Sequence, residues 1–293
     1  MRTNLRSHPH AGRVALALVL LLACRAPEHA AESGELRVIS LSPSTTDIVV
    51  ALGHRDALVG VDQLSGAIDG LRDLPSLGGL FAPDLERALE LRPMLVLGVR
   101  SESQAAFFAQ LRGRGVRVLE IDSSGSLESV LTTYETIGQQ IGRQPEARAL
   151  AAEVRAQLAE VARSVASRAY PSVALVLERE PLYVAAGGSF ASALIDTAGG
   201  RNVFADLPQA YPQVSLELLA ERAPEVLIDS TQGAALGLEA EAAARAYWSR
   251  FSWVRRVELV PARIVTLPGA QLAEAARSLR ATLHPDLAAL SAP

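Results

Sequence analysis

The chain has 293 residues, 49% of them hydrophobic, which is enough to bury one large core or two cores of ordinary size. The formal net charge is −4, so we expect no basic patch of the kind that binds nucleic acid. All 28 basic residues are arginine, which excludes a phosphate-binding lysine of the Walker type and a lysine that forms a Schiff base.

The N-terminus has the pattern of an export signal. Arginines near the start precede an apolar run, residues 14–23, that is too short to span a bilayer as a mature helix. The single cysteine, Cys24, follows Leu-Leu-Ala in a sequence that resembles a bacterial lipobox, in which the cysteine is lipidated and becomes the new N-terminus. We therefore expect a signal peptide at 1–23 and a lipid-anchored tether at 24–35. The alternative is an ordinary secretory signal cut near residue 30; in both cases the mature protein leaves the cytoplasm.

Residues 36–143 alternate between short apolar runs and segments of helical pattern. The expected strands are 36–41, 58–61, 94–97 and 116–121, and the expected helices are 44–52, 85–91, 103–112 and 127–141. Ser44 and Asp47 have the spacing of a capping box, and Asp84 can cap the second helix. Residues 64–83 are rich in Gly, Pro and Asp and are expected to form a loop with room for one helical turn. The alternation favours a parallel sheet covered by helices on both faces.

Residues 144–168 are predicted to form one long helix. Its apolar residues recur at spacings of four and three and share one stripe: Leu150, Val154, Leu158, Val161 and Val165. Pro145 suits a first helical turn, and Tyr170-Pro171 ends the run. At about 1.5 Å per residue the helix is roughly 37 Å long, which exceeds an ordinary globular helix.

After this helix the alternation of strands and helices starts again. The expected strands are 172–177, 225–228 and 263–267, and the expected helices are 189–198, 216–222, 240–250 and 272–283. We therefore predict an α/β fold of two doubly wound lobes, 36–143 and 169–293, joined by the helix 144–168.

An internal repeat supports this division. Residues 84–97 align with 215–228 without a gap, and the matched pairs are Leu85 with Leu216, Glu86 with Glu217, Glu90 with Glu221, and Pro93 with Pro224. Each copy predicts a capped helix with a glutamate in its first turn, then a proline, then a strand. A glutamate is also favourable at any helix N-terminus, so stabilisation of its own helix is the alternative role for each of these two glutamates.

Four segments give the chain a family resemblance. They are RVISLSPSTTDIVVALG (37–53), PDLERALELRPMLVLG (83–98), PLYVAAGGSFASALIDTAGGRNVF (181–204) and YPQVSLELLAERAPEVLI (211–228). In these segments the chain resembles the solute-binding proteins of bacterial ABC importers for vitamin B12 and ferric siderophores, above all the cobalamin-binding branch. The resemblance covers about residues 36–290 and rests on several ordered motifs together.

The resemblance implies a fold and a function. The family has two α/β lobes bridged by one long rigid helix, with the ligand in the cleft between the lobes. The implied function is that of a receptor that captures cobalamin or a related corrinoid and delivers it to the membrane permease, without catalysis. A ferric siderophore or haem is the alternative ligand. The implied partners are the ABC permease dimer and one bulky ligand, with a monomeric receptor that meets the membrane only through its lipid anchor.

The resemblance also assigns a role to the repeated glutamates. In this family one glutamate on each lobe docks onto arginines of the two-fold symmetric permease, and Glu86 and Glu217 fall on those positions. One acidic residue per lobe is what two equivalent sockets would require.

The ligand site is expected outside the carboxyl ends of the parallel strands. Those ends offer Ser42-Pro43, Asp62-Gln63, Arg100, Glu178-Arg179 and Pro268-Gly269. Pro43 and Arg100 match family positions near the ligand. For Glu178 and Arg179, an ion pair at the surface or at a hinge is the alternative to ligand binding.

Aromatic positions complete the predicted site. Tyr211 stands where the cobalamin-binding proteins have a tryptophan, so an aromatic face is kept there. Leu80 and Phe81 fall where a second tryptophan is expected. Two segments depart from the family: residues 62–65 replace a tyrosine-bearing loop, and 269–271 replace a Pro-Arg or aspartate-bearing segment. These departures leave the identity of the ligand open.

Other site chemistries find little support. The histidines after the signal, His29, His54 and His284, are not paired by spacing, so no metal site and no cofactor are predicted. Tyr183 or Tyr211 could serve as an axial ligand of haem. Neither a G-x-G-x-x-G segment after a strand nor a G-x-S-x-G elbow occurs, so an α/β hydrolase is only a remote alternative.

Overall fold

The computed structural model describes residues 35–68, 70–79, 82–122, 125–231, 238–266 and 268–289. Three predicted site residues, Cys24, Leu80 and Phe81, lie outside these ranges. The described residues from Leu36 onward pack as one unit, so the lobe boundaries at residues 143 and 168 stay a prediction.

The first sheet is entirely parallel. Its strands run in the order β2-β1-β3-β4 and are β1 (Val38–Ser40), β2 (Leu58–Val61), β3 (Leu95–Val99) and β4 (Arg117–Ile121). The helices of this part are α1 (Pro43–Ala51), α2 (Leu85–Glu90), α3 (Glu102–Arg112) and α4 (Leu127–Gln140), with 3-10 turns at Arg55–Ala57 and Ser65–Ala67. Successive β1 residues face opposite sides, so Val38 packs in the core with α1 and α4, and Ile39 in the core with α2 and α3. The predicted parallel sheet with helices on both faces is confirmed.

The first helix begins differently from its prediction, whereas the second begins as predicted. The N-cap of α1 is Ser42, whose hydroxyl accepts from the amide of Thr45 at 3.4 Å, and Pro43 occupies the first turn. The predicted capping box of Ser44 and Asp47 is therefore wrong, because Ser44 already lies inside the helix. Asp84 caps α2 as expected and accepts from the amide of Arg87 at 3.0 Å.

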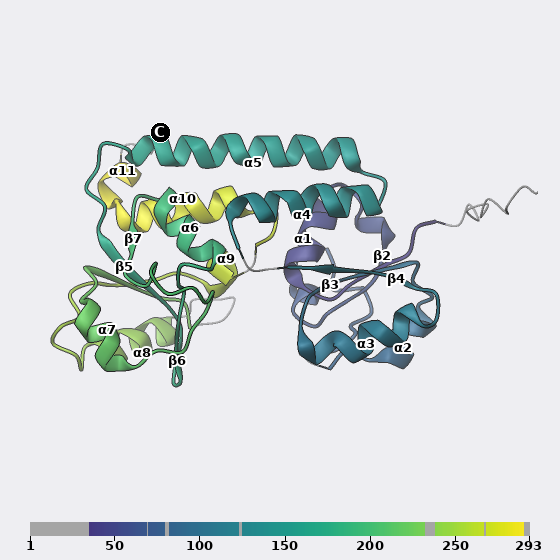
Figure 1. Ribbon diagram of the computed structural model, residues 1–293, viewed down its shortest axis with the longest axis horizontal. Coiled ribbons are helices and arrows are strands. Elements are labelled where there is room, and N and C mark those ends of the chain that lie inside the picture. The colour runs from purple at the N-terminus through teal and green to yellow at the C-terminus, as the bar shows by residue number, and fades with distance from the viewer. Residues whose placement is uncertain are drawn as a thin grey trace, which may run out of the picture. The chain divides into compact units, whose positions relative to one another are not determined.

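The long helix α5 spans Gln144–Val165 and ends three residues before its predicted end. Its buried face consists of Ala147, Ala151, Val154, Leu158, Val161 and Val165. The helix packs against α4 and against α10 (Leu272–Leu283), and Figure 1 shows α5 running alongside both. It therefore bridges the elements that surround the two sheets.

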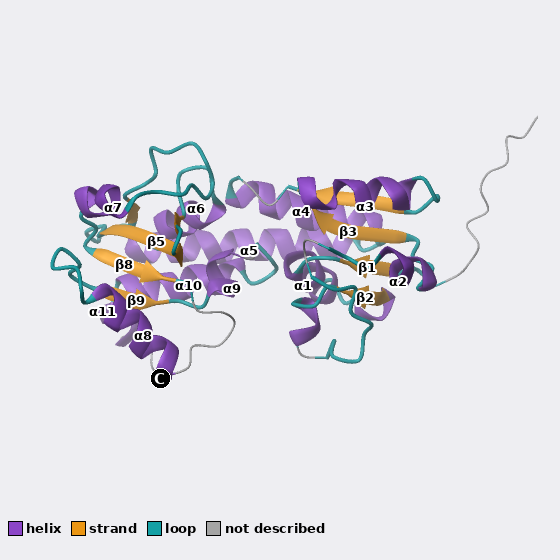
Figure 2. Cartoon of the chain, turned by 90° about the horizontal axis from the view of Figure 1, so that it is seen from below, coloured by secondary structure: helices purple, strands orange, loops and turns teal. Residues whose placement is uncertain are grey.

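The second sheet is mixed. Its strands run in the order β6-β5-β8-β9, with β7 beside β5, and are β5 (Ser172–Arg179), β6 (Leu182–Val184), β7 (Arg201–Asn202), β8 (Val226–Asp229) and β9 (Val257–Leu259). The β5–β6 pair is antiparallel and the other pairs are parallel. The helices of this part are α6 (Phe190–Thr197), α7 (Leu216–Arg222), α8 (Leu238–Trp248), α9 (Ala262–Thr266), α10 and α11 (Pro285–Ala289). Figure 2 shows the two sheets as separate groups of strands.

One predicted strand of this sheet is a helix. Residues 263–267 were expected to be a strand because Ile264, Val265 and Thr266 are β-branched, but α9 covers Ala262–Thr266. Pro261 precedes this helix, where proline is tolerated, and the Thr266 hydroxyl donates to the carbonyl of Ala262 at 2.7 Å within it. The outer strand of the sheet is instead β9, which was not predicted, and β6, β7 and α11 were also missed.

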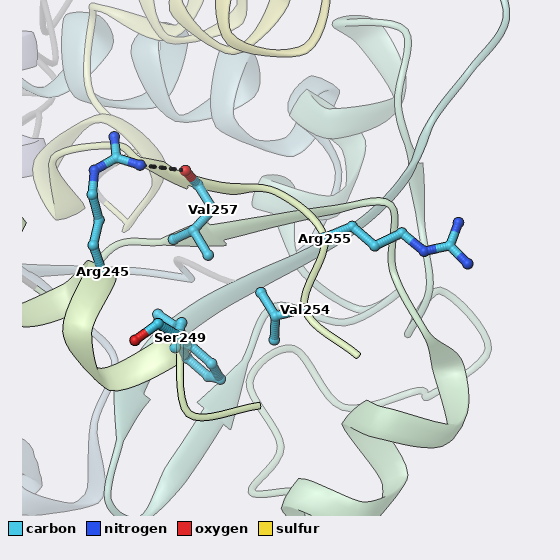
Figure 3. A pocket seen from close by; sticks show the side chains of 6 residues that line it. Arg245, Ser249, Val254, Arg255 and Val257 are labelled. Carbon is cyan, nitrogen blue, oxygen red and sulfur yellow. Dashed lines mark hydrogen bonds between the residues drawn. The ribbon is translucent and has the colours of Figure 1, made fainter. Parts of the chain in front are cut away.

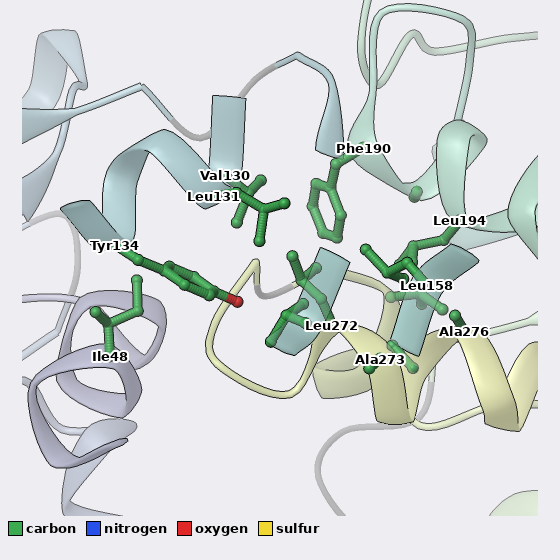
Figure 4. Close-up of a cluster of buried hydrophobic side chains, with 14 of the residues drawn as sticks. Ile48, Val130, Leu131, Tyr134, Leu158, Phe190, Leu194, Leu272, Ala273 and Ala276 are labelled. Carbon is green, nitrogen blue, oxygen red and sulfur yellow. The ribbon is translucent and has the colours of Figure 1, made fainter. Parts of the chain in front are cut away.

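The largest cluster of buried hydrophobic side chains includes residues from the helices of both sheets. Figure 4 shows Ile48, Val130 and Tyr134 from α1 and α4 on one side, Phe190 and Leu272 from α6 and α10 on the other, with Leu158 of α5 among them. Helices α4 and α6 also contact each other directly. The predicted two-lobed α/β arrangement is therefore held by a shared core beneath α5.

Candidate functional site

The carboxyl edge of the first sheet carries two of the predicted ligand-binding residues. Pro43 is half-buried in the first turn of α1, shortly after β1. Arg100 follows β3; its side chain is exposed, and its backbone amide donates to the carbonyl of Ile121 at 2.8 Å. Because β1 and β3 are parallel neighbours, both residues lie at the same edge, as predicted.

The loop after β2 is held by a buried carboxylate. Asp62 is 3% exposed and accepts from the backbone amides of Leu64 at 2.9 Å and Ser65 at 3.1 Å, and from the Ser65 hydroxyl. Burial raises the pKa of Asp62, and the hydrogen bonds from Ser65 and Leu64 oppose that rise without cancelling it. The carboxylate is thus engaged inside the loop and does not point outward to a ligand.

This loop exposes an apolar residue that the sequence analysis did not single out. The side chain of Leu64 is 65% exposed, although its amide is fixed by Asp62. Leu64 lies at the carboxyl edge of the first sheet, in the loop that replaces the tyrosine-bearing loop implied by the family resemblance. A single leucine in a turn-rich loop gives no periodic signal, so only the exposed fraction identifies it as a candidate contact.

Glu178 and Arg179, at the carboxyl end of β5, have different surroundings. A register shift between Val176 and Glu178 makes Glu178 the partner of Tyr183 and Arg179 the partner of Leu182. Consecutive strand residues face opposite sides, so the side chains of Glu178 and Arg179 lie on opposite faces of the sheet. Glu178 is exposed and accepts from the adjacent amide of Arg179 at 3.0 Å, and Tyr183 on the same side is 37% exposed.

Arg179 has a buried partner that the sequence did not reveal. Its Nε donates to Oδ2 of Asp229 at 2.8 Å, and the Arg179 side chain is only 16% exposed, while Asp229 is fully buried. Trp248 Nε1 donates to the same oxygen at 2.5 Å. The guanidinium also lies 5.4 Å from the centre of the Tyr247 ring, within the range of a cation–π contact. Arg179 therefore forms an ion pair, as the alternative interpretation allowed, but with Asp229 and inside the fold.

Asp229 stays ionised despite its burial. Burial acts to raise the pKa of Asp229, but the hydrogen bonds from Arg179, Trp248 and the backbone together outweigh this effect and hold the pKa below its ordinary value. Its other oxygen accepts from the amide of Thr231 at 3.0 Å and from the Thr231 hydroxyl at 2.8 Å. The carboxylate therefore joins the ends of β5 and β8 to α8.

Tyr211 is half-buried rather than openly displayed. It packs against the large shared core, and burial raises the pKa of its hydroxyl. The hydroxyl oxygen is shielded from solvent and has no hydrogen-bond partner among the described residues. The backbone around it is bonded to β6 and to the residues that follow β6, since the amide of Val184 donates to the carbonyl of Pro212 at 3.2 Å and that of Ala186 to the carbonyl of Ala210 at 3.0 Å.

The repeated glutamates occupy matching places. Glu86 lies in the first turn of α2 and Glu217 in the first turn of α7, and both side chains are exposed. A hydrogen bond from its own backbone amide, followed by one from the Ser215 hydroxyl, lowers the pKa of Glu217. No ion pair within the described part of the chain engages either glutamate.

The internal repeat extends to the backbone. After α2 and α7 the chain passes through a left-handed residue that is not glycine, Arg92 at φ 44° and Ala223 at φ 42°, and each is followed by a proline. The caps are also equivalent, because Ser215 accepts from the amide of Leu218 at 3.1 Å just as Asp84 caps α2. The predicted order of cap, helix, proline and strand is confirmed in both copies.

Pro268 and Gly269 were expected at the end of a strand and are not there. They follow α9 and lead into α10, and both are buried. The carbonyl of Gly269 accepts from the hydroxyl of Tyr134 in α4, so this segment contacts the helices of the first sheet. It does not join the predicted ligand edge of the second sheet.

A cavity of about 200 Å³ lies elsewhere (Figure 3). It is found between the end of α8 and the start of β9 and is lined by Arg245, Trp248, Ser249, Val254, Arg255 and Val257. Arg245 is already engaged, since it donates to the carbonyl of Val257 at 3.2 Å and pairs with Glu241 at 2.9 Å. None of the predicted ligand-binding residues lines this cavity.

Two further properties concern the described residues alone. Within them no helix is both long and apolar enough to cross a membrane. Nor do three or more His, Cys, Asp or Glu side chains gather there in a way that could hold a metal ion.

Comparison with known proteins identifies the family. The family model described as periplasmic binding protein matches residues 38–252. The chain is 30% identical over 219 residues to the vitamin B12-binding protein of Photorhabdus laumondii subsp. laumondii, across 75% of this chain and 78% of that protein. A periplasmic haem-binding protein from Pseudomonas aeruginosa has 28% sequence identity and a TM-score of 0.73, over 85% of this chain and 92% of its own. The periplasmic vitamin B12-binding protein of Vibrio cholerae shares the fold with a TM-score of 0.72 and 23% identity, over 86% and 97% of the two chains. The chain belongs to the periplasmic binding protein family.

Proposed function

We propose that the protein is the solute-binding receptor of an ABC importer and that it captures cobalamin or a related corrinoid. Members of its family are exported binding proteins, and the function is therefore capture and delivery of a small ligand without catalysis. The observation that carries the choice of ligand is the 30% identity to a vitamin B12-binding protein over three quarters of the chain. Haem is the second candidate, because a haem-binding protein of the same fold is 28% identical.

The ligand would lie between the two lobes, against the carboxyl edges of both sheets. On the first lobe, Pro43, Arg100 and the exposed Leu64 support this placement. A role for Leu80 and Phe81 rests on the sequence alone. A mixture of apolar contacts and few polar groups suits a bulky planar ligand.

On the second lobe, Tyr211 would offer a ring edge and Glu178 an exposed carboxylate. Arg179 would act mainly through its ion pair with Asp229, which holds the end of the strand that carries Glu178.

Delivery would rest on Glu86 and Glu217. Both are exposed, both occupy the first turn of a short capped helix, and neither is engaged by an ion pair in the described part of the chain. Equivalent acidic groups on equivalent helices suit a permease with two equivalent basic sockets. Attachment to the membrane would rest on lipidation of Cys24 in its lipobox-like sequence.

The test is a binding screen on the purified protein with cyanocobalamin, haemin and several ferric siderophores, read by thermal shift and visible absorbance. A ligand present at a hundred times its Kd should stabilise the protein by about 2.7 kcal/mol. We expect saturable stabilisation by cyanocobalamin. Saturable binding of haemin alone would select the haem alternative, and the absence of binding to every ligand would refute the proposal.

A further inference from the structure

Segment 268–271, between α9 and α10, is bonded to the helices that cover the first sheet. The backbone amide of Ala270 donates to Oδ2 of Asp47 in α1 at 2.7 Å. The hydroxyl of Tyr134 in α4 donates to the carbonyl of Gly269 at 2.6 Å. Figure 4 shows the Tyr134 hydroxyl directed toward the chain that leads into Leu272. The two bonds therefore hold both ends of one peptide group, the one between Gly269 and Ala270, from two separate helices.

The approach of Asp47 to this segment leaves no room for a Cβ atom at position 269 unless Asp47 or the segment moves. A Cβ atom there would lie 2.5 Å from Oδ2 of Asp47 and 3.2 Å from its Cγ. A carbon atom at that distance from a carboxylate oxygen overlaps it, so one of the two would have to move. The fit depends on the absence of a side chain at Gly269.

The surroundings of Tyr134 and Asp47 raise the pKa values of both side chains. Tyr134 is fully buried, and burial together with the nearby Asp47 charge raises the pKa of its hydroxyl, which remains a donor at neutral pH. Burial raises the pKa of Asp47, while hydrogen bonds from Ala270 and Gln271 act in the opposite direction. Asp47 is thus a hydrogen-bond acceptor enclosed by the segment that it holds.

These contacts join the two halves of the molecule at a place other than α5. Helices α1 and α4 cover the first sheet, whereas α10 packs against α5 and α6 beside the second. Apart from α5, the two lobes are connected by the shared core, in which α4 also contacts α6 directly. The hydrogen bonds to residues 268–271 add directional contacts to this apolar packing, and directional contacts oppose rotation of one lobe against the other.

We propose that Asp47 and Tyr134 form a clasp on residues 268–271 that fixes the relative orientation of the two lobes. The clasp is independent of the ligand's identity. It also explains why Pro268 and Gly269 are buried rather than displayed at a ligand edge. With the clasp closed, the lobes differ little in orientation between the free and the loaded protein.

The test measures the distance between the lobes by pulsed electron paramagnetic resonance. Spin labels are placed on exposed helical positions through Gln110→Cys in α3 and Ala243→Cys in α8, in the exported protein carrying Cys24→Ala so that no other thiol is present. In the double variant Asp47→Ala/Tyr134→Phe we expect the distance distribution to widen roughly twofold or more. A double variant that melts cooperatively with an unchanged distribution overturns the proposal.

The controls repeat the same chemical changes outside the clasp. Tyr170→Phe alters an exposed tyrosine, and Asp56→Ala alters an exposed aspartate, so both should leave the distribution unchanged. A widening in these controls equal to that of the double variant would also overturn the proposal.

A measurement on the unaltered protein covers the case in which the double variant does not fold. The amide of Ala270 is expected to exchange its hydrogen roughly tenfold or more slowly than an amide of an exposed loop, because Asp47 accepts its hydrogen bond. Exchange of that amide at the rate of an open loop overturns the proposal. None of these measurements needs a ligand, so failure of the clasp and failure of the proposed function can be told apart.

Discussion

Replacement of Asp229 by asparagine should destabilise the protein almost as much as its replacement by alanine. Each carboxylate oxygen accepts two hydrogen bonds, Oδ2 from Arg179 and Trp248 and Oδ1 from the amide and hydroxyl of Thr231. Asparagine offers only one oxygen. In either orientation its amide nitrogen would face at least one N–H donor, so at least one hydrogen bond would be lost together with the charge of the ion pair.

The size of the effect is determined by burial. Removing one partner of a buried ion pair costs about 3 to 5 kcal/mol, and leaving a buried donor unsatisfied costs about 1 to 3 kcal/mol. The Arg179 side chain is 16% exposed, although its Nη2 is shielded from solvent, and Trp248 is fully buried. We therefore expect the free energy of unfolding to fall by about 3 kcal/mol, at the lower end of the range for a buried pair.

Urea unfolding of the purified variants measures this loss. The matched control is Asp206→Asn, which alters the ion pair between Asp206 and Arg222. The side chain of Asp206 is 56% exposed, so this substitution should change the free energy of unfolding little. An Asp229→Asn protein within about 1 kcal/mol of the parent would refute the reasoning.

The same pair predicts a pH dependence. Because the pKa of folded Asp229 lies below its ordinary value, the stabilisation is present above that value and is lost as the pH falls through the folded pKa. The parent should therefore lose stability below about pH 4 more steeply than the asparagine variant.

Three further predictions concern delivery, anchoring and the ligand surface. Glu86→Arg combined with Glu217→Arg should abolish uptake in cells that carry the cognate permease while leaving the ligand Kd unchanged, since like charges would meet at each socket; normal uptake would contradict the docking role. Cys24→Ala should move the protein from the membrane to the soluble fraction, and an unchanged membrane fraction would rule out the lipid anchor. Tyr211→Ala should weaken ligand binding by about 1 to 3 kcal/mol, and a titration in which this variant keeps the parent Kd would place Tyr211 outside the site. Tyr211→Phe should leave the free energy of unfolding equal or raise it by up to about 1 kcal/mol, because the lost hydroxyl has no partner among the described residues.

Strongly periodic segments were predicted well from the sequence. The ends of α7, α10 and β2 agree with prediction, and α5 differs only in its last turn. These elements have an apolar pattern of the right period and clear stop signals, so local sequence and tertiary packing favour the same structure. The duplicated helices were found in the same way, because cap, proline and strand recur in one register.

Long-range contacts account for the elements and partners that were missed. The β-branched run in α9 favours a strand locally, but Val265 is fully buried in the shared core and the helix is set by that packing. Asp47 was expected to cap its own helix and instead binds Ala270, 223 residues further along. Arg179 and Asp229 meet only because β5 and β8 are neighbours and a register shift turns Arg179 to that side. A single sequence carries no local signal for such partners.

The two short acidic helices have a consequence for how this protein can change. Each is bounded by a side-chain cap on one side and by a left-handed residue and a proline on the other, Arg92-Pro93 after α2 and Ala223-Pro224 after α7. Substitutions on their surfaces leave these boundaries intact. An insertion or deletion inside either helix disturbs these boundaries. Each residue added or removed rotates the remainder of the helix by about 100°, which changes the direction in which the proline and the following strand leave the helix relative to the cap. These two segments should therefore vary in composition among relatives but keep their length, even where loops on either side grow or shrink.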